Sequence, residues 1–169
     1  PQALAVLVTT DAELAGKVPA ELERQLAGLS RREIARQSLA DRGVILIAAD
    51  LAEAIELANV IAIEHLELMI ADPWAQIPHI RHAGAIFLGH HTPEAAGDYL
   101  AGPNHVLPTM GTARFASALG VETFLKKSSV ISYSRQALQD DADHIRRLAG
   151  LEGLTGHAAS VTVRLGDGE

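Results

Sequence analysis

The stretches AVLVT at residues 5–9 and VILIA at residues 44–48 decide the fold class of this chain. Each is a short apolar run of the length expected for a fully buried strand. Two more strands are predicted at residues 65–69 and at residues 84–88 (GAIFL), the latter bounded by glycines. Helical patterns separate these strands, and such alternation predicts an α/β layered domain with a largely parallel sheet.

The helices are predicted from apolar periodicity and from capping residues. Between the first two strands, apolar residues recur at spacings of four and three from Leu14 to Leu29, which predicts a helix bent near Pro19. Ser30-Arg31-Arg32-Glu33 has the pattern of a capping box for the next helix, which we expect to end at Gly43. Later helices are expected to begin at three cap-like patterns: Asp50 with Glu53, Asp72-Pro73, and Thr92-Pro93-Glu94.

The pattern changes after residue 119. We expect a short helix at residues 121–125, a strand at residues 129–132 and a longer helix at residues 134–150, followed by a tail that is either helix or strand. The sequence therefore predicts two domains. Residues 1–119 form the α/β domain, and residues 120–169 form a small satellite domain.

Composition excludes several classes of protein. The 169 residues are 48% hydrophobic and 21% charged, which is typical of a folded soluble domain. The net charge of −7 argues against a protein built to bind nucleic acid or anionic membranes. Because the chain has no cysteine, disulfides and thiol catalysis are excluded. No apolar run suits a membrane span or a signal peptide, so we expect a cytoplasmic protein. The start at Pro1 rather than Met favours a piece of a longer polypeptide.

No nucleotide-binding loop is visible, so the candidate site residues are carboxylates and histidines. The sequence has neither a G-x-G-x-x-G pattern after a strand nor a Walker-type phosphate loop. Glu64-His65 lies where a helix gives way to a strand, and such a pair can divide acid/base work. The alternative interpretation is a surface glutamate beside a histidine that caps a helix.

Residues 97–109 (GDYLAGPNHVLPT) form the densest polar loop of the sequence. Asp98 is a candidate oxygen ligand for a metal, and His105 a candidate nitrogen ligand or substrate contact. The alternative interpretation is an Asx turn and a histidine that packs the loop. The remaining candidates are interpreted as ordinary surface groups when taken alone: the adjacent His90 and His91, whose side chains point to opposite faces, His79, His82 and His144 on predicted helices, and Glu152 and His157 in the tail.

Five segments together carry a resemblance to a known family. They are EHLEL (64–68), GAIFLG (84–89), TPEAAGDY (92–99), GPNHVLPTMGTARF (102–115) and EGLTGHAASV (152–161). In this order and spacing they resemble histidinol dehydrogenases from one end of the chain to the other. The resemblance implies an incomplete Rossmann-like three-layer domain followed by a small α-rich C-terminal domain. It also implies a zinc-dependent oxidation of L-histidinol, through L-histidinal, to L-histidine, with two NAD⁺ reduced in turn.

The resemblance assigns roles to six residues of this chain. Glu64 and His65 match the family's acid/base pair, and Asp98 and His157 match two zinc ligands. The substrate-binding set would comprise His65, Asp98, His105, Glu152 and His157. Members of the family are homodimers with intertwined subunits, in which the small C-terminal domain reaches the neighbour's active site. On this resemblance, Glu152 and His157 serve the site of the partner subunit.

Two departures from the family pattern limit what the chain is expected to do. Ile63 stands where a proline commonly precedes the Glu-His pair. The chain also matches only the C-terminal two-fifths of the family's length. The other NAD-binding domain and two further zinc ligands, a Gln and a His, would precede Pro1. We therefore expect no cofactor-binding residue in this chain, and no activity of the chain in isolation.

Two other functions remain open at this point. One is a related dehydrogenase that acts on another small alcohol, which we expect to differ around His105 and Glu152. The other is an assembly module that kept the fold and lost the chemistry. A degenerate module loses site residues at random, whereas all six expected residues stand in place here. This favours an enzyme.

Overall fold

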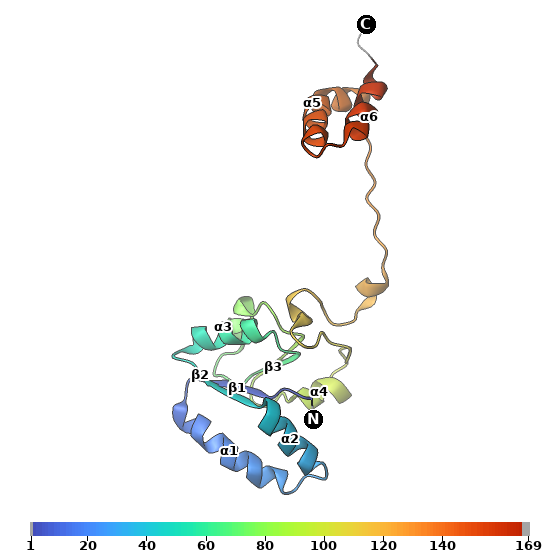
Figure 1. Cartoon of the computed structure of the whole chain (residues 1–169). Helices are drawn as coiled ribbons and strands as arrows, with labels where there is room; N and C mark the ends of the chain where they lie inside the picture. Colours follow the sequence, from blue (N-terminus) through green and yellow to red (C-terminus); the bar gives the residue numbers. More distant parts are fainter. Residues whose placement is uncertain (1, 167–169) are drawn as a thin grey trace. The chain divides into compact units, whose positions relative to one another are not determined.

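The computed structural model describes residues 2–166 of the chain. It is a mixed α/β protein that divides into two compact units, Pro1–Phe124 and Leu125–Glu169 (Figure 1). The division falls five residues after the boundary expected from the sequence. All four strands lie in the first unit, and the regular elements of the second unit are helices.

The first unit contains two small parallel sheets. Strand β1 (Val6–Thr9) pairs with β2 (Val44–Ile47), and β3 (His65–Leu68) pairs with β4 (Ala85–Leu88). The four predicted strands and their parallel direction are thus confirmed. The difference from the prediction is that the described residues form two sheets of two strands each, rather than one continuous sheet.

Helices follow the strands as the alternation predicted. Between β1 and β2 lie α1 (Ala12–Leu26) and α2 (Arg32–Arg42); α3 (Leu51–Ile61) follows β2, and α4 (Glu94–Tyr99) follows β4. The capping pattern at α3 is confirmed, because Asp50 accepts the Glu53 N–H at 2.8 Å and Glu53 accepts the Ala49 N–H at 2.6 Å. The capping box predicted at Ser30 is wrong. The residue that precedes α2 is Arg31, and no side chain caps that helix.

Short 3₁₀ helices replace α-helices at several places. These are η1 (Trp74–His79), η2 (Thr112–Arg114) and η3 (Val121–Phe124). The α-helix expected from Asp72-Pro73 is η1 instead. Pro78 lies within it and has no N–H to continue an α-helical ladder, which explains the difference.

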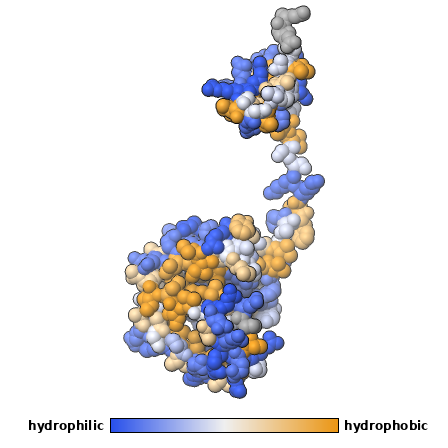
Figure 2. Space-filling view, in the orientation of Figure 1, coloured by the Kyte–Doolittle hydropathy of each residue, from blue (hydrophilic) through white to orange (hydrophobic). Residues whose placement is uncertain are grey.

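The core of the first unit contains few large apolar side chains. Its large buried apolar residues are Leu26, Ile55, Leu68 and Phe87, and the rest are alanines. Asn59 on α3 is also buried, and its amide donates to the His79 carbonyl while its oxygen accepts the Arg81 N–H. Many apolar side chains of this unit remain exposed, and Figure 2 shows them gathered on one face of it.

The second unit is a helical hairpin. Helix α5 (Arg135–Leu151) is capped by the preceding residue, Ser134, whose hydroxyl accepts the Ala137 N–H. The helix packs against α6 (Thr155–Leu165). Ala142, Ala149 and Val161 are buried between them. The tail is therefore helical. The strand predicted at residues 129–132 is wrong, because residues 125–133 form neither helix nor strand. None of the described helices is long and apolar enough to cross a bilayer.

Candidate active site

Strand β3 and helix α4 bring the polar residues of the site together. His65 is the first residue of β3. Glu94 and Asp98 lie four residues apart on α4, a spacing that places both on one face of a helix. Asp98 is therefore helical, and its assignment to a loop from the sequence is corrected. His105 follows in the loop after α4.

The side chains converge on the imidazole of His65. Its Nε2 lies 3.7 Å from Glu94 Oε1 and 3.9 Å from Asp98 Oδ1. These distances are too long for hydrogen bonds, and Nε2 is buried without a hydrogen-bond partner among the described residues. A buried polar atom without a partner costs about 1–3 kcal/mol, so such an atom in a polar cluster indicates that something else binds there.

Asp98 contacts both histidines of the cluster. Its Oδ1 lies 2.7 Å from His105 Nδ1, and the Asp98 side chain is only 15% exposed, whereas that of His105 is 68% exposed. This contact joins the two residues directly, which the two interpretations of the loop had left open. They form one hydrogen-bonded pair.

The pKa values of the Glu94 and Asp98 carboxyls are shifted in opposite directions. The hydrogen bond with Asp98, helped by burial, raises the pKa of the Glu94 carboxyl. The hydrogen bond from Glu94, and then that from His105, lower the pKa of Asp98. Two carboxyls placed this close do not ionise together readily, which agrees with the opposite directions of these two shifts. The hydrogen bond to Asp98 also raises the pKa of His105.

Glu64 lies at the edge of the same cluster. Helix α3 ends at Ala62, a fully buried alanine with the left-handed φ of 53°, and this turn directs the chain into β3. The Glu64 carbonyl accepts the Ala85 N–H at 2.8 Å and so joins the start of β3 to β4. The charge of Glu64 is near enough to His105 to contribute to the raised pKa of that histidine.

Glu94 is the site residue that sequence reasoning missed. The sequence identified it only as part of a helix start. A usable signal was present, because residues 94 and 98 of TPEAAGDY are one helical turn apart and Asp98 was already a candidate.

The other histidines were predicted to be ordinary surface groups, three of them on helices, and the structure corrects the placement of one of these three. His90 and His91 are both exposed, as expected. His79 ends η1 and His144 lies on α5, but His82 lies outside the helices in the segment before β4.

Glu152 and His157 belong to the second unit. Glu152 directly follows α5, and His157 lies in the first turn of α6. Both are exposed. The structure thus brings together His65, Asp98 and His105, with Glu64 beside them, within the first unit.

Among the described residues, one group has the donors and the closeness that a metal ion requires. Ligand atoms of His65, Glu94 and Asp98 all lie within 4.8 Å of one another. Imidazole nitrogen and carboxylate oxygen suit zinc and other divalent ions of the first transition row. The donor set of the first unit therefore fits a metal ion, and Asp98 is its most buried carboxylate.

Comparisons with known proteins identify the family. The family model described as histidinol dehydrogenase matches residues 1–165. The histidinol dehydrogenase of Desulfotalea psychrophila is 77% identical over 165 residues, and that of Syntrophotalea carbinolica is 59% identical over 165 residues. Each match covers 98% of this chain and 38% of the relative, so the chain spans about two-fifths of the length of these curated relatives.

A solved structure agrees with these matches. The crystal structure of histidinol dehydrogenase from Elizabethkingia anophelis has a TM-score of 0.77 and 34% sequence identity. It covers 95% of this chain, which in turn covers 37% of that chain. The family model and the close relatives both extend over nearly the whole sequence, and the chain belongs to the histidinol dehydrogenase family.

Proposed function

We propose that this chain forms part of a zinc-dependent, NAD-linked enzyme that oxidises L-histidinol, through L-histidinal, to L-histidine. Membership of the family supports the reaction. One structural observation supports the site: the buried Nε2 of His65 has no partner and faces the carboxyls of Glu94 and Asp98. Because the chain spans only part of its relatives' length, the activity is proposed for the whole protein that contains it.

His65 is the proposed proton acceptor of the first oxidation. The alcohol O–H gives its proton to the imidazole while the carbon-bound hydride passes to NAD⁺, which leaves an aldehyde, NADH and a protonated histidine. The buried Nε2 has no hydrogen-bond partner among the described residues, so its hydrogen-bonding capacity is left for a substrate hydroxyl, and the carboxyl groups of the cluster favour the positive charge that the ring then gains.

Glu64 is the proposed base of the second oxidation. It takes a proton from water as the water oxygen bonds to the aldehyde carbon, while the aldehyde oxygen takes back the proton that His65 had gained, which gives the hydrated aldehyde. This hydrate then loses a hydride to a second NAD⁺ and a proton to the protein, and becomes the carboxylic acid. The place of Glu64 beside His65 and close to His105 supports a role at the same reacting carbon.

Asp98 and His157 are the proposed zinc ligands within this chain, and His105 and Glu152 are proposed substrate contacts. When bound, zinc polarises and orients the amino alcohol. Asp98 fits this role because it is ionised and lies between three other polar groups. His157 and Glu152 fit in a weaker sense, since both are exposed and free to meet groups outside their helical hairpin.

The finer architecture is proposed from the same family. Residues 1–119 would be the second half of a Rossmann-like three-layer domain, and residues 120–169 a small C-terminal domain that serves the partner's site in an intertwined homodimer. The site would act in the cytoplasm, where biosynthetic substrates are found. The exposed apolar face of the first unit supports a larger assembly around it (Figure 2).

The test is an assay of the whole protein with L-histidinol, NAD⁺ and zinc, in the wild type and in His65→Asn. We expect NADH from the wild type, and a kcat lowered about 10²–10⁴-fold in His65→Asn, the usual value of a general base. His90→Asn is the matched control, since His90 is exposed and lies after β4. A wild type that forms no NADH from histidinol contradicts the function, and a fully active His65→Asn contradicts the role of His65.

A further inference from the structure

Glu67 lies on the same strand as His65 but outside every role assigned above. The two residues are two positions apart on β3, so their side chains leave the same face of the strand. Glu67 Oε1 accepts the backbone N–H of Glu94, the first residue of α4, at 2.8 Å. This hydrogen bond joins the strand that carries the proposed base to the helix that carries Glu94 and Asp98.

We propose that Glu67 is a positioning residue of the active site: its carboxylate fixes the start of α4 over β3, so that Glu94 and Asp98 face His65. The inference rests on the proposed function for its catalytic consequence. Its structural part, the attachment of α4 to β3 through Glu67, stands independently of which reaction the site performs.

One other side-chain hydrogen bond lies near the start of α4: the Thr92 hydroxyl donates to the carbonyl of Leu88, the last residue of β4, at 2.7 Å. The first N–H groups of a helix have no partner within the helix, and a side chain before the helix usually supplies one. Pro93 holds that place here, and its side chain makes no capping hydrogen bond. Glu67 supplies the acceptor instead, from a position 27 residues earlier in the sequence.

The shortness of α4 makes its placement depend on tertiary contacts. The helix has six residues, and helices this short are marginal without packing. Within the helix itself, the second anchor is Gly97, where an added Cβ would lie 2.6 Å from Phe87 Cε1, so that the helix backbone packs directly on the ring of this β4 residue. The Phe87 ring also lies 5.9 Å from the His65 ring, centroid to centroid.

The two anchors restrain different movements. The apolar contact at Gly97 sets how closely α4 approaches the sheet, whereas a hydrogen bond is directional and fixes where the helix starts along β3. A shift of about 1 Å at a catalytic group can cost about 10²-fold in rate. Loss of the Glu67 contact therefore affects the alignment of Glu94 and Asp98 with His65 as well as stability.

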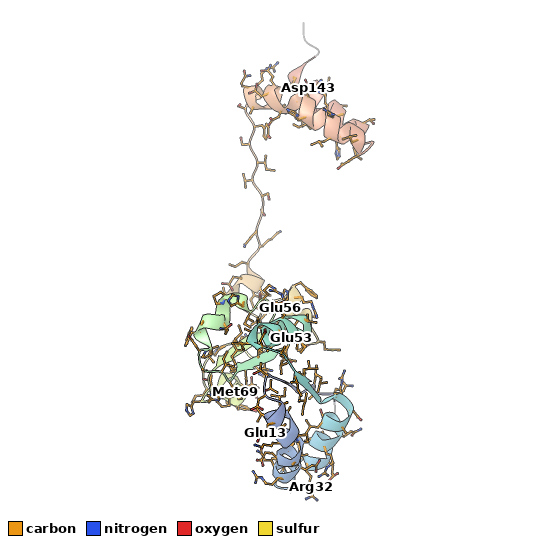
Figure 3. The ribbon with its side chains drawn as sticks, turned by 90° about the vertical axis from the view of Figure 1, so that its left-hand side faces the viewer. Glu13, Arg32, Glu53, Glu56, Met69 and Asp143 are labelled. Atoms are coloured by element: carbon orange, nitrogen blue, oxygen red, sulfur yellow. The ribbon has the colours of Figure 1, made fainter. Side chains whose placement is uncertain are left out.

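The experiment must separate positioning from ordinary stabilisation. In the whole protein, Glu67→Leu removes the acceptor, Glu67→Gln keeps an acceptor oxygen at the same reach, and Glu67→Asp keeps the charge but withdraws it by about 1.5 Å, one C–C bond. The matched control is Glu53→Leu. Glu53 also accepts a backbone N–H at a helix start, that of Ala49 at 2.6 Å, and Figure 3 shows it on α3.

We expect Glu67→Leu to lower kcat at saturating zinc about 10–100-fold, and Glu67→Gln to restore most of it. Glu67→Asp should fall between them, and it remains informative if Glu67→Leu does not fold. Glu53→Leu should lower the melting temperature by an amount similar to Glu67→Leu while leaving kcat unchanged. The Glu94 amide should exchange with solvent faster in Glu67→Leu, and at the wild-type rate in Glu67→Gln.

Three results would overturn the inference: full kcat in Glu67→Leu and Glu67→Asp, equal losses of kcat in Glu67→Leu and Glu53→Leu, or no rescue by Glu67→Gln. A failure of the proposed function looks different. In that case the wild type does not oxidise histidinol at all, and exchange of the Glu94 amide in the same variants still decides whether Glu67 holds α4.

Discussion

The two units of this chain hold their candidate residues in opposite ways. In the first unit, His65, Asp98 and His105 are each within 4 Å of another charged or polar side chain, and Asp98 is largely buried. In the second unit, Glu152 and His157 are exposed on a two-helix hairpin whose core consists of small residues. The first unit thus holds its polar residues in a partly buried cluster, whereas the second unit holds its residues on the surface of a hairpin.

The difference in burial indicates which unit has the features of a preformed site. The first unit buries polar groups at positions that apolar residues could occupy. The buried Nε2 of His65, which has no hydrogen-bond partner among the described residues, lowers the stability of this unit. Such a cost is typical of a functional site. Among the described residues, the side chains of Glu152 and His157 make no hydrogen bond or ion pair, so any role they have depends on groups outside the second unit.

His157→Asn should give the largest contrast between function and folding. The hydrogen bonds of His157 within α6 are made by its backbone, from its N–H to Leu154 and from Ser160 to its carbonyl. The free energy of unfolding should therefore change by less than about 0.5 kcal/mol. On the proposed ligand role, zinc affinity of the whole protein should fall more than about 100-fold, because even residues behind a ligand cost about 10–100-fold.

Zinc content after dialysis and thermal unfolding measure the two effects, with His144→Asn as the control. His144 is exposed on α5, the other helix of the same unit. Wild-type zinc affinity in His157→Asn would remove His157 from the ligand set and leave the second unit without a metal role.

The sequence predicted the strands better than it predicted the site. Four of the five predicted strands are present, because a short strand needs only a local pattern, although β1 is half-buried and β2 largely exposed rather than fully buried. The turn from α3 into β3, which places Glu64 and His65, could not be predicted, since it uses a left-handed alanine rather than a glycine. The capping pattern at Ser30 failed because α2 starts one residue later than that pattern requires, so that Arg31 rather than Ser30 precedes the helix.

Sequence reasoning missed the part of the site that depends on tertiary contacts. Glu94 becomes a site residue only because Glu67, far from it in sequence, holds the start of α4 over β3. A local sequence pattern does not predict a contact between residues this far apart in the chain. The roles of Asp98 and His157 came from the family resemblance, and the structure adds the hydrogen bond of Asp98 to His105, which spacing alone had left open.

Gly97→Ala tests how tightly the first unit holds α4. An added Cβ meets Phe87 Cε1 at 2.6 Å, well inside van der Waals contact, so the helix must move away from β4 and carry Asp98 with it. We expect kcat of the whole protein to fall about 10–100-fold. Gly16→Ala in α1 is the matched control, because its Cβ meets nothing within 4 Å and it gains the same helix propensity. Equal activity of the two variants would mean that α4 is not held in a fixed place.

Asp98→Asn should give the smallest effect, a change in the titration of His105 in the zinc-free protein. The hydrogen bond to Asp98 raises the pKa of His105 above its ordinary value of 6.5. The pair therefore stabilises the fold fully below about pH 6.5, and this contribution is lost as the pH rises through the raised pKa. In Asp98→Asn the pKa of His105 should fall towards 6.5, whereas Glu56→Gln, which removes a carboxylate paired with Arg81, should leave it unchanged. Imidazole NMR signals, assigned with His105→Asn, measure both. Because His105 is exposed, water and salt screen this pair, and an unchanged titration in Asp98→Asn would show that the contact contributes nothing in solution.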